Sequence, residues 1–166
     1  MGLNSAALPE IGKIVNIIPA SHGAAVVGDV VSLKNYHKAY FILQYTGSGA
    51  ANTVSVHLYG GATVAGIVAA NLTLYNWWVL NATTAGMLLT DTLTKGAVGT
   101  VAVVTSVANQ DMLLVIEVDP ADYEALGYDC FTIQTDASNA ANWQNCIAVL
   151  VPGRYQQATP PSAIID

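Results

Sequence analysis

The three histidines, His22, His37 and His57, are the side chains best suited to acid–base or metal chemistry near neutral pH. They are scattered, and none belongs to an HxxxH or HExxH pattern or to a Cys/His cluster with zinc spacing. Ser48 lacks the GxSxG pattern of a nucleophile elbow, and the chain contains no GxxxxGK[ST] phosphate loop. The sequence therefore predicts no catalytic residue, no cofactor and no enzyme activity.

The densest acidic group comprises Asp119, Asp122, Glu124 and Asp129. Carboxylate oxygens of this kind could bind Ca²⁺, but a second interpretation needs no metal. Asp119 is a good N-cap, Pro120 suits the first helical position, and Gly127 can adopt the left-handed conformation that ends a helix. We therefore predict a short connector helix within 119–127 and no metal site.

Two adjacent tryptophans, Trp77 and Trp78, closely follow Tyr75. Adjacent residues of a strand face opposite sides, so one tryptophan can enter a core while the other points outward. An outward tryptophan could contact another protein subunit, or could stack on a sugar ring together with Tyr75. The alternative is that both tryptophans lie in apolar surroundings within the fold.

The two cysteines, Cys130 and Cys146, each begin a strand-like run. Two cysteines in a chain of 166 residues do not make a disulfide framework. Strands joined by a loop could bring them near each other. We expect instead two reduced, buried thiols that pack as small apolar side chains.

Short runs of Val, Ile, Thr and aromatic residues, separated by Gly, Asn, Asp and Ser, are typical of strands and turns. The expected strands are 14–18, 29–33, 39–45, 52–59, 72–80, 100–107, 112–118, 130–135 and 147–151. Strands and helices do not alternate. The fold class that this favours is all-β, a β-sandwich or a jelly-roll-like barrel with one short helix and extended terminal arms.

The expected turns include 46–50 and the pair Gly60 and Gly61, which permit positive φ, and a hairpin loop at 108–111. Within 52–59, Val54, Val56 and Leu58 alternate with polar residues, as in a strand with one face on a core. The run 112–116 is apolar at every position. We expect a second sheet to cover one of its faces and a neighbouring subunit to cover the other.

The length favours one domain. The expected organisation is an N-terminal arm and first strand over 1–25, a β domain over 26–151, and an extended arm with polyproline character over 152–166. The arm either folds back on its own domain or lies on a neighbour. Its candidate contact residues, beside Trp77 and Trp78, are Arg154, Tyr155, Pro160, Pro161 and Ile164.

Charged residues are scarce, because the chain has five Lys and Arg and eleven Asp and Glu although 53% of its residues are hydrophobic. A monomer of this size exposes roughly 7,800 Å², so we expect partner protein to cover part of the exterior. The alternative is a monomer made soluble by hydroxyls and amides. A net charge of −6 disfavours direct nucleic-acid binding. No apolar run approaches the ~20 residues of a spanning helix, and no secretory signal is recognisable, so no membrane is expected.

Three segments together resemble the decoration, or cement, proteins of tailed-bacteriophage heads. They are the run GDVVSLKNY at 28–36, the run LLVIEV at 113–118 leading to GYDC at 127–130, and RYQQATPPSAI at 154–164. The resemblance implies an all-β subunit, made in the bacterial host cytoplasm, on the outer capsid surface of a virion. It further implies that the subunit bridges major capsid proteins, as a homo-oligomer with a trimer favoured over a dimer.

Two other functions share this composition. A carbohydrate-binding surface module would use Trp77, Trp78 and Tyr75 as a stacking platform. A tail-tube or connector subunit would assemble into tubes or rings.

Overall fold

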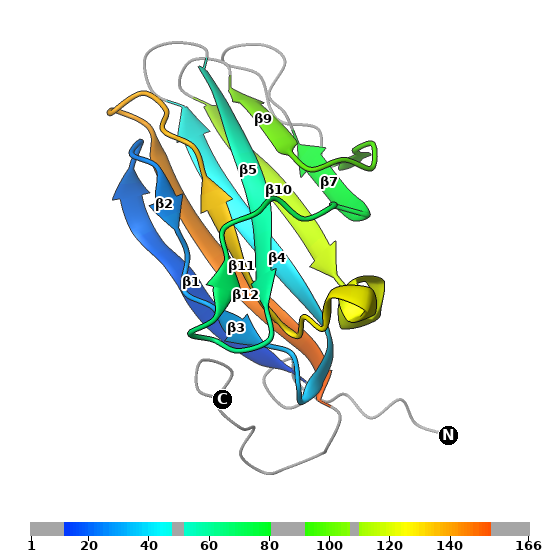
Figure 1. Ribbon diagram of the computed structural model, residues 1–166. Helices are drawn as coiled ribbons and strands as arrows, with labels where there is room; N and C mark the ends of the chain where they lie inside the picture. Colours follow the sequence, from blue (N-terminus) through cyan, green and yellow to red (C-terminus); the bar gives the residue numbers. More distant parts are fainter. Residues whose placement is uncertain (1–11, 48–51, 81–91, 107–109, 154–166) are drawn as a thin grey trace, which may run out of the picture.

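Two antiparallel β-sheets pack face to face in the computed structural model of the chain, which describes residues 12–47, 52–80, 92–106 and 110–153 (Figure 1). Within these residues sheet A has six strands. Their order is β1 (Lys13–His22), β12 (Trp143–Gly153), β4 (Tyr36–Gly47), β10 (Gln110–Val118), β7 (Asn76–Leu80) and β8 (Thr94–Lys95). The last strand of the chain thus lies between the first strand and β4, inside the sheet.

Sheet B is built around β11 (Cys130–Thr135) and β5 (Asn52–Gly61), which pair along six residues each. The short strands β2 (Val26–Val27) and β3 (Val31–Ser32) pair with the other edge of β11. Two more strands, β6 (Ile67–Val68) and β9 (Ala102–Ser106), pair with β5. The chain passes repeatedly between the sheets, for example from β4 to β5, from β9 to β10 and from β10 to β11. With two packed antiparallel sheets, the fold is an all-β sandwich, as predicted.

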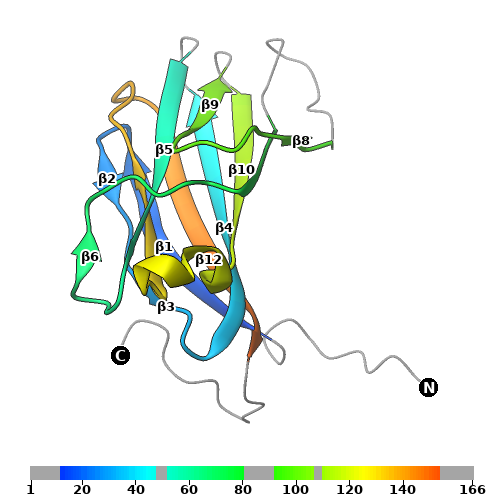
Figure 2. The ribbon, with the colours of Figure 1, turned by 45° about the vertical axis from the view of Figure 1, so that its right-hand side comes forward.

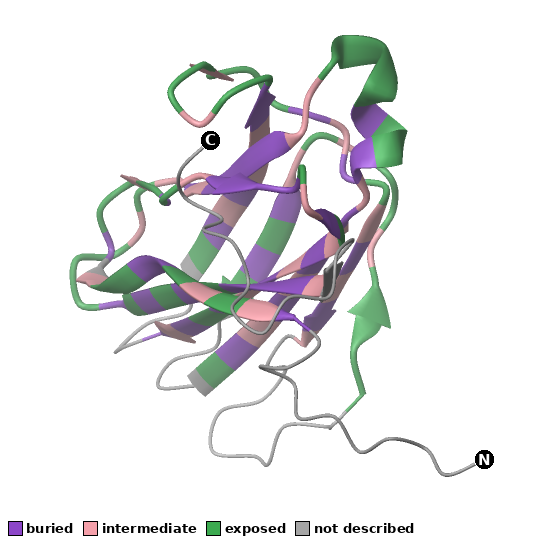
Figure 3. Cartoon of the chain, turned by 90° about the horizontal axis from the view of Figure 1, so that it is seen from below, coloured by how far each residue is buried: buried purple, intermediate pink, exposed green. Residues whose placement is uncertain are grey.

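The core lies between the two sheets and follows the alternation of the strands, as the colours of Figure 3 show. In β4, Phe41, Leu43 and Tyr45 are at most 1% exposed, whereas Ile42 and Gln44 between them point outward. In β5 the expected inward residues Val54, Val56 and Leu58 are likewise buried. In β10, Met112, Leu114 and Ile116 enter the core, which leaves Leu113 and Val115 on the outer face.

The predicted helix is present as a 3₁₀ helix, Pro120–Leu126, at the lower end of the sandwich (Figure 2). The Asp119 carboxylate accepts a hydrogen bond from the Ala121 N–H at 3.0 Å, which caps the first turn. Gly127 has a φ of 67° and donates its N–H to the Glu124 carbonyl at 2.9 Å. The start and end signals were therefore correct. The turn is tighter than an α-helix, as is common for connectors this short.

Two predicted turns are wrong. Gly60 and Gly61 belong to β5, and Gly127 is the glycine with positive φ among the described residues. A Cβ on Gly60 would lie 2.8 Å from the Leu72 side chain, so the glycine permits close packing there rather than a turn. The expected hairpin at 108–111 is not one, because β9 pairs with β5 in sheet B while β10 belongs to sheet A.

In the part of the chain that the structure describes, no helix has the length and apolarity to cross a membrane.

Candidate interaction surface

The outward residues of sheet A form rows across the strands, because residues opposite each other on paired strands share a face. Ile147 of β12 is opposite Ile42 of β4, Ile42 is opposite Val115 of β10, and Val115 is opposite Trp78 of β7. Four strands that are distant in the sequence therefore contribute one continuous apolar row.

Further apolar residues lie on either side of this row. Ile14, Val149 and Tyr40 form a second row, in which Val149 is 9% exposed and which continues into Glu117. Leu113 and Leu80 lie in a third row, which also contains the polar residues Gln44 and Asn145. We call the whole set the outer apolar face of sheet A: Ile14, Tyr40, Ile42, Trp78, Leu80, Leu113, Val115, Ile147 and Val149. Ile14 is 48% exposed and Ile147 is 37% exposed. Apolar side chains gathered in this way mark an interaction site more often than scattered ones do.

Charged residues adjoin the apolar residues of this face, since Glu117 is opposite Tyr40 and Lys95 is opposite Trp78. Lys38 Nζ is 2.8 Å from Glu117 Oε1 and 3.7 Å from Asp119 Oδ2. The hydrogen bond to Glu117 is the main reason why the pKa of Lys38 is raised above its ordinary value. Lys95 lies 5.7 Å from the centre of the Trp78 ring, a cation–π contact. The centre of the face thus carries no charged side chain.

The outer face of sheet B is polar by comparison. Its outward residues include Thr53, Ser55, His57, Tyr59, Thr105 and Gln134. The Tyr59 hydroxyl donates to the Gln134 side-chain oxygen, and His57 Nε2 lies 3.4 Å from Asp136 Oδ2. Two apolar residues are exposed on this face, Val103 at 39% and Val27, opposite Gln134, at 58%. The two sides of the sandwich are therefore chemically distinct.

The two predicted tryptophans face opposite sides of β7. Trp77 is 9% exposed and donates its indole N–H to the Ala97 carbonyl at 2.8 Å. Trp78 points outward. Tyr75 is 39% exposed, and its ring packs against Tyr123 at 5.7 Å. Since Trp77 enters the core, the structure does not assemble the three rings into one stacking platform.

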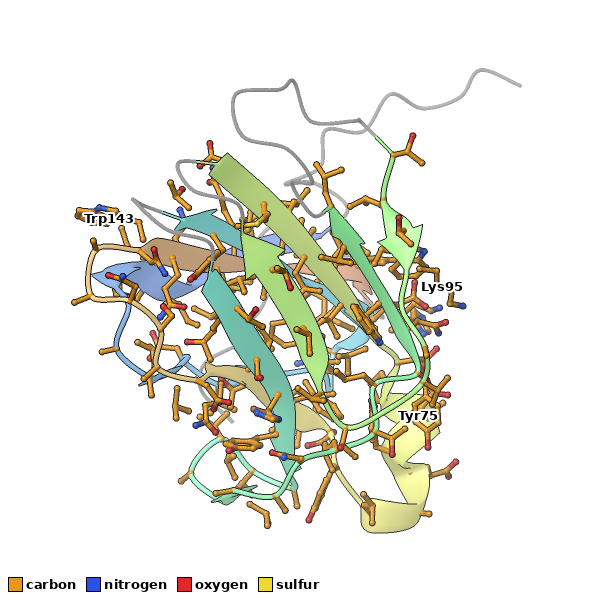
Figure 4. All side chains as sticks on the ribbon, turned by 90° about the horizontal axis from the view of Figure 1, so that it is seen from above. Tyr75, Lys95 and Trp143 are labelled. Atoms are coloured by element: carbon orange, nitrogen blue, oxygen red, sulfur yellow. The ribbon has the colours of Figure 1, made fainter. Side chains whose placement is uncertain are left out.

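Trp143, at the start of β12, is 46% exposed and was not singled out from the sequence. It lies on the side of the molecule away from Lys95 and Tyr75 (Figure 4). The polar residues Gln144 and Asn145 follow it and do not fit the apolar pattern of a strand, so the predicted strand began only at residue 147. The predicted contact residues Arg154, Tyr155, Pro160, Pro161 and Ile164 lie outside the described residues.

A hollow of about 760 Å³ lies beside the 3₁₀ helix, lined by residues that include His37, Lys38, Asp119, Tyr128 and Asp129. Two of the polar groups in it already have roles, since Asp119 caps the helix and Lys38 pairs with Glu117. Among the described residues no group of three or more His, Cys, Asp or Glu side chains could hold a metal ion. Of the acidic cluster, Asp119 caps the helix, Asp122 lies in its first turn, and the Asp129 carboxylate accepts a hydrogen bond from the Cys130 thiol.

We predict that removing divalent cations leaves the protein unchanged. Because Asp119 is committed to the Ala121 N–H, EDTA should not shift the melting temperature by more than about 1 °C. The measurement is thermal unfolding with and without EDTA. A fall of several degrees, restored by added Ca²⁺, would show that a metal stabilises the fold.

Both cysteines are free and buried, as expected. Cys130 lies in sheet B and Cys146 in sheet A. Burial raises the pKa of the Cys146 thiol well above its usual range, which keeps it protonated and unreactive at neutral pH.

The chain was compared with protein-family models, with curated proteins and with solved structures, and none of them matches it.

Proposed function

We propose that this protein is a structural virion subunit that binds the outside of a phage capsid and stabilises it by bridging major capsid proteins. The observation that carries the proposal is that a protein with few charged residues has an outer apolar face on sheet A, which is typical of a subunit that works in an assembly with other protein. The resemblance of three segments to phage decoration proteins supplies the capsid as the partner. The all-β sandwich is consistent with both.

The stabilisation follows from mass action. A subunit that binds the assembled shell but not its separate parts stabilises the shell by about 2.7 kcal/mol per site at a hundredfold excess over Kd. Because a capsid repeats each site many times, a modest affinity per site is sufficient. This mode of stabilisation requires no catalytic group.

The two ends of the described domain emerge at the same end of sheet A. Lys13, at the start of β1, is opposite Leu150, near the end of β12. Residues 154–166 would reach roughly 40 Å if fully extended. A segment of that length, starting beside β1, is long enough to reach a neighbouring subunit, so we assign it a role in bridging.

Deleting 154–166 should weaken binding to capsids about tenfold or more, because the bridging contacts of the arm are lost. The deletion should begin after Gly153, since Pro152 and Gly153 are part of β12. The measurement is co-sedimentation of the truncated protein with undecorated shells over a range of concentrations.

An unchanged melting temperature would show that the truncated domain is intact. If the truncated protein decorates shells with full occupancy, the assigned role of the arm is wrong. If the full-length protein does not bind shells and instead forms rings or tubes in electron micrographs, a tail-tube or connector role replaces the proposed one.

A further inference from the structure

We propose that the outer apolar face of sheet A packs against the same face of a second copy of this chain. This proposal rests on the proposed structural role, and it identifies the protein that covers that face. It assigns the face to self-association, and it leaves the capsid contacts to other parts of the subunit.

The size of the face is sufficient for a specific contact. Strands about 4.8 Å apart that rise about 3.4 Å per residue give a five-stranded face of roughly 20 by 30 Å, or ~600 Å² before side-chain relief is counted. A standard protein interface takes about 800 Å² from each partner. The whole outer face of β1, β12, β4, β10 and β7 is therefore comparable to one half of a small stable dimer. In it Asn16, Gln44 and Asn145 border the apolar residues, as polar residues border the core of an interface.

The chemistry of the face suits a copy of itself. Its central row, Ile147, Ile42, Val115 and Trp78, has no hydrogen-bonding group other than the Trp78 indole N–H, and its partner must therefore be apolar. A second copy offers the same apolar surface. Sheets pack on each other at about 10 Å through such side chains, as the two sheets of this sandwich already do.

Charge does not oppose the contact, although each chain has a net charge of −6. Lys38 and Glu117, at one end of the face, neutralise each other at 2.8 Å. Bringing two copies together therefore buries no unpaired charge from this pair, which would otherwise cost several kcal/mol. The polar outer face of sheet B, with His57, Tyr59 and Gln134, would have to be desolvated in a similar contact and is less suited to it.

A face that packs against itself forms an isologous contact with two-fold symmetry and closes as a dimer. Ile42 lies in the middle of the central row. Ile147, in the same row, is 37% exposed. A lysine at either position would place its ammonium group, and that of its symmetry mate, within the dry centre of the contact. A matched control is Val103, 39% exposed on the outer face of sheet B.

The test is the mass of the full-length protein by light scattering and its dimer Kd by analytical ultracentrifugation. The wild type should have twice the subunit mass of 17.3 kDa. Ile147→Lys should raise the dimer Kd at least thirtyfold, and Val103→Lys should leave it within about twofold. Circular dichroism and the melting temperature of each variant show whether it folds. If Ile42→Lys does not fold, Ile147→Lys at its more exposed site still tests the contact.

A monomeric wild type at tens of micromolar, a trimeric mass, or equal effects of Ile147→Lys and Val103→Lys would each overturn the inference. Co-sedimentation with shells separates it from the proposed function. A dimeric wild type that does not bind shells would refute the capsid role and leave the dimer contact standing. A wild type that binds shells but is monomeric in solution would support the capsid role and refute the dimer contact.

Discussion

Replacing Trp77 with alanine is expected to lower the free energy of unfolding by about 3–5 kcal/mol, the usual cost of removing a large buried aromatic side chain. The Trp77 ring is 9% exposed and lies against Gly96, so closely that a Cβ on that glycine would overlap it. Its indole N–H binds the Ala97 carbonyl at 2.8 Å. The Trp77 side chain therefore helps to hold the 94–97 segment against β7, together with the backbone pairing of β8 with β7.

Urea denaturation followed by circular dichroism measures this loss, and Gly96→Ala provides the matched test of its cause. Alone, Gly96→Ala should cost about 1–3 kcal/mol, because the added methyl group displaces the ring. In the Trp77→Ala background the same substitution should cost much less, since the space is then free. Additive effects of the two substitutions would contradict the direct packing that we describe.

Tyr123→Ala should lower the free energy of unfolding by a similar amount, about 3–5 kcal/mol. Tyr123 is 4% exposed and is the side chain by which the 3₁₀ helix is anchored to the domain. Its ring packs between those of Phe131, at 5.2 Å, and Tyr75, at 5.7 Å. Its hydroxyl donates to the Thr73 carbonyl at 2.6 Å. The control Tyr123→Phe keeps the ring contacts and should cost only about 1 kcal/mol.

The same residue gives the protein a dependence on alkaline pH. Burial raises the pKa of Tyr123 above the value near 10 that it has in the unfolded chain. The unfolded state therefore releases the proton first as pH rises. The contribution of Tyr123 is present below about pH 10 and is lost above it, by up to ~1.4 kcal/mol per pH unit. Tyr123→Phe should make the loss of stability between pH 9.5 and 11.5 less steep than in the wild type. Equal slopes for the two proteins would show that the hydroxyl is not shielded.

Much of the sandwich could be predicted because each strand has a recognisable pattern of residue types within its own segment of the sequence. The strand 130–135 was predicted with the bounds of β11, and the inward residues of β5 followed from alternation. The helix was predicted from its capping residues, Asp119 and Gly127. The errors arose where tertiary contacts decide. Gly60 is a strand residue because Leu72 packs against it, and β9 pairs with β5 rather than with its neighbour β10.

The candidate surface could be predicted only in part. The run 112–116 already showed that one strand is apolar on both faces, and Leu113 and Val115 do lie on the outer side. The remainder of the face depends on the register that places Ile147 and Ile42 beside Val115, and residues so distant in the sequence give no local signal of their pairing. The sequence also could not decide which of Trp77 and Trp78 points inward, because the surroundings on both faces of β7 are apolar.

The central place of β12 in sheet A has a consequence for biosynthesis. Because β12 lies between β1 and β4, sheet A cannot form completely until β12 has been synthesised. Pairings between such remote segments raise the contact order, and domains of this kind fold in milliseconds to seconds rather than microseconds. A chain that terminates early lacks β12 and cannot complete the sheet. The topology thus distinguishes complete domains from truncated ones, since only chains that include β12 can form the whole of sheet A.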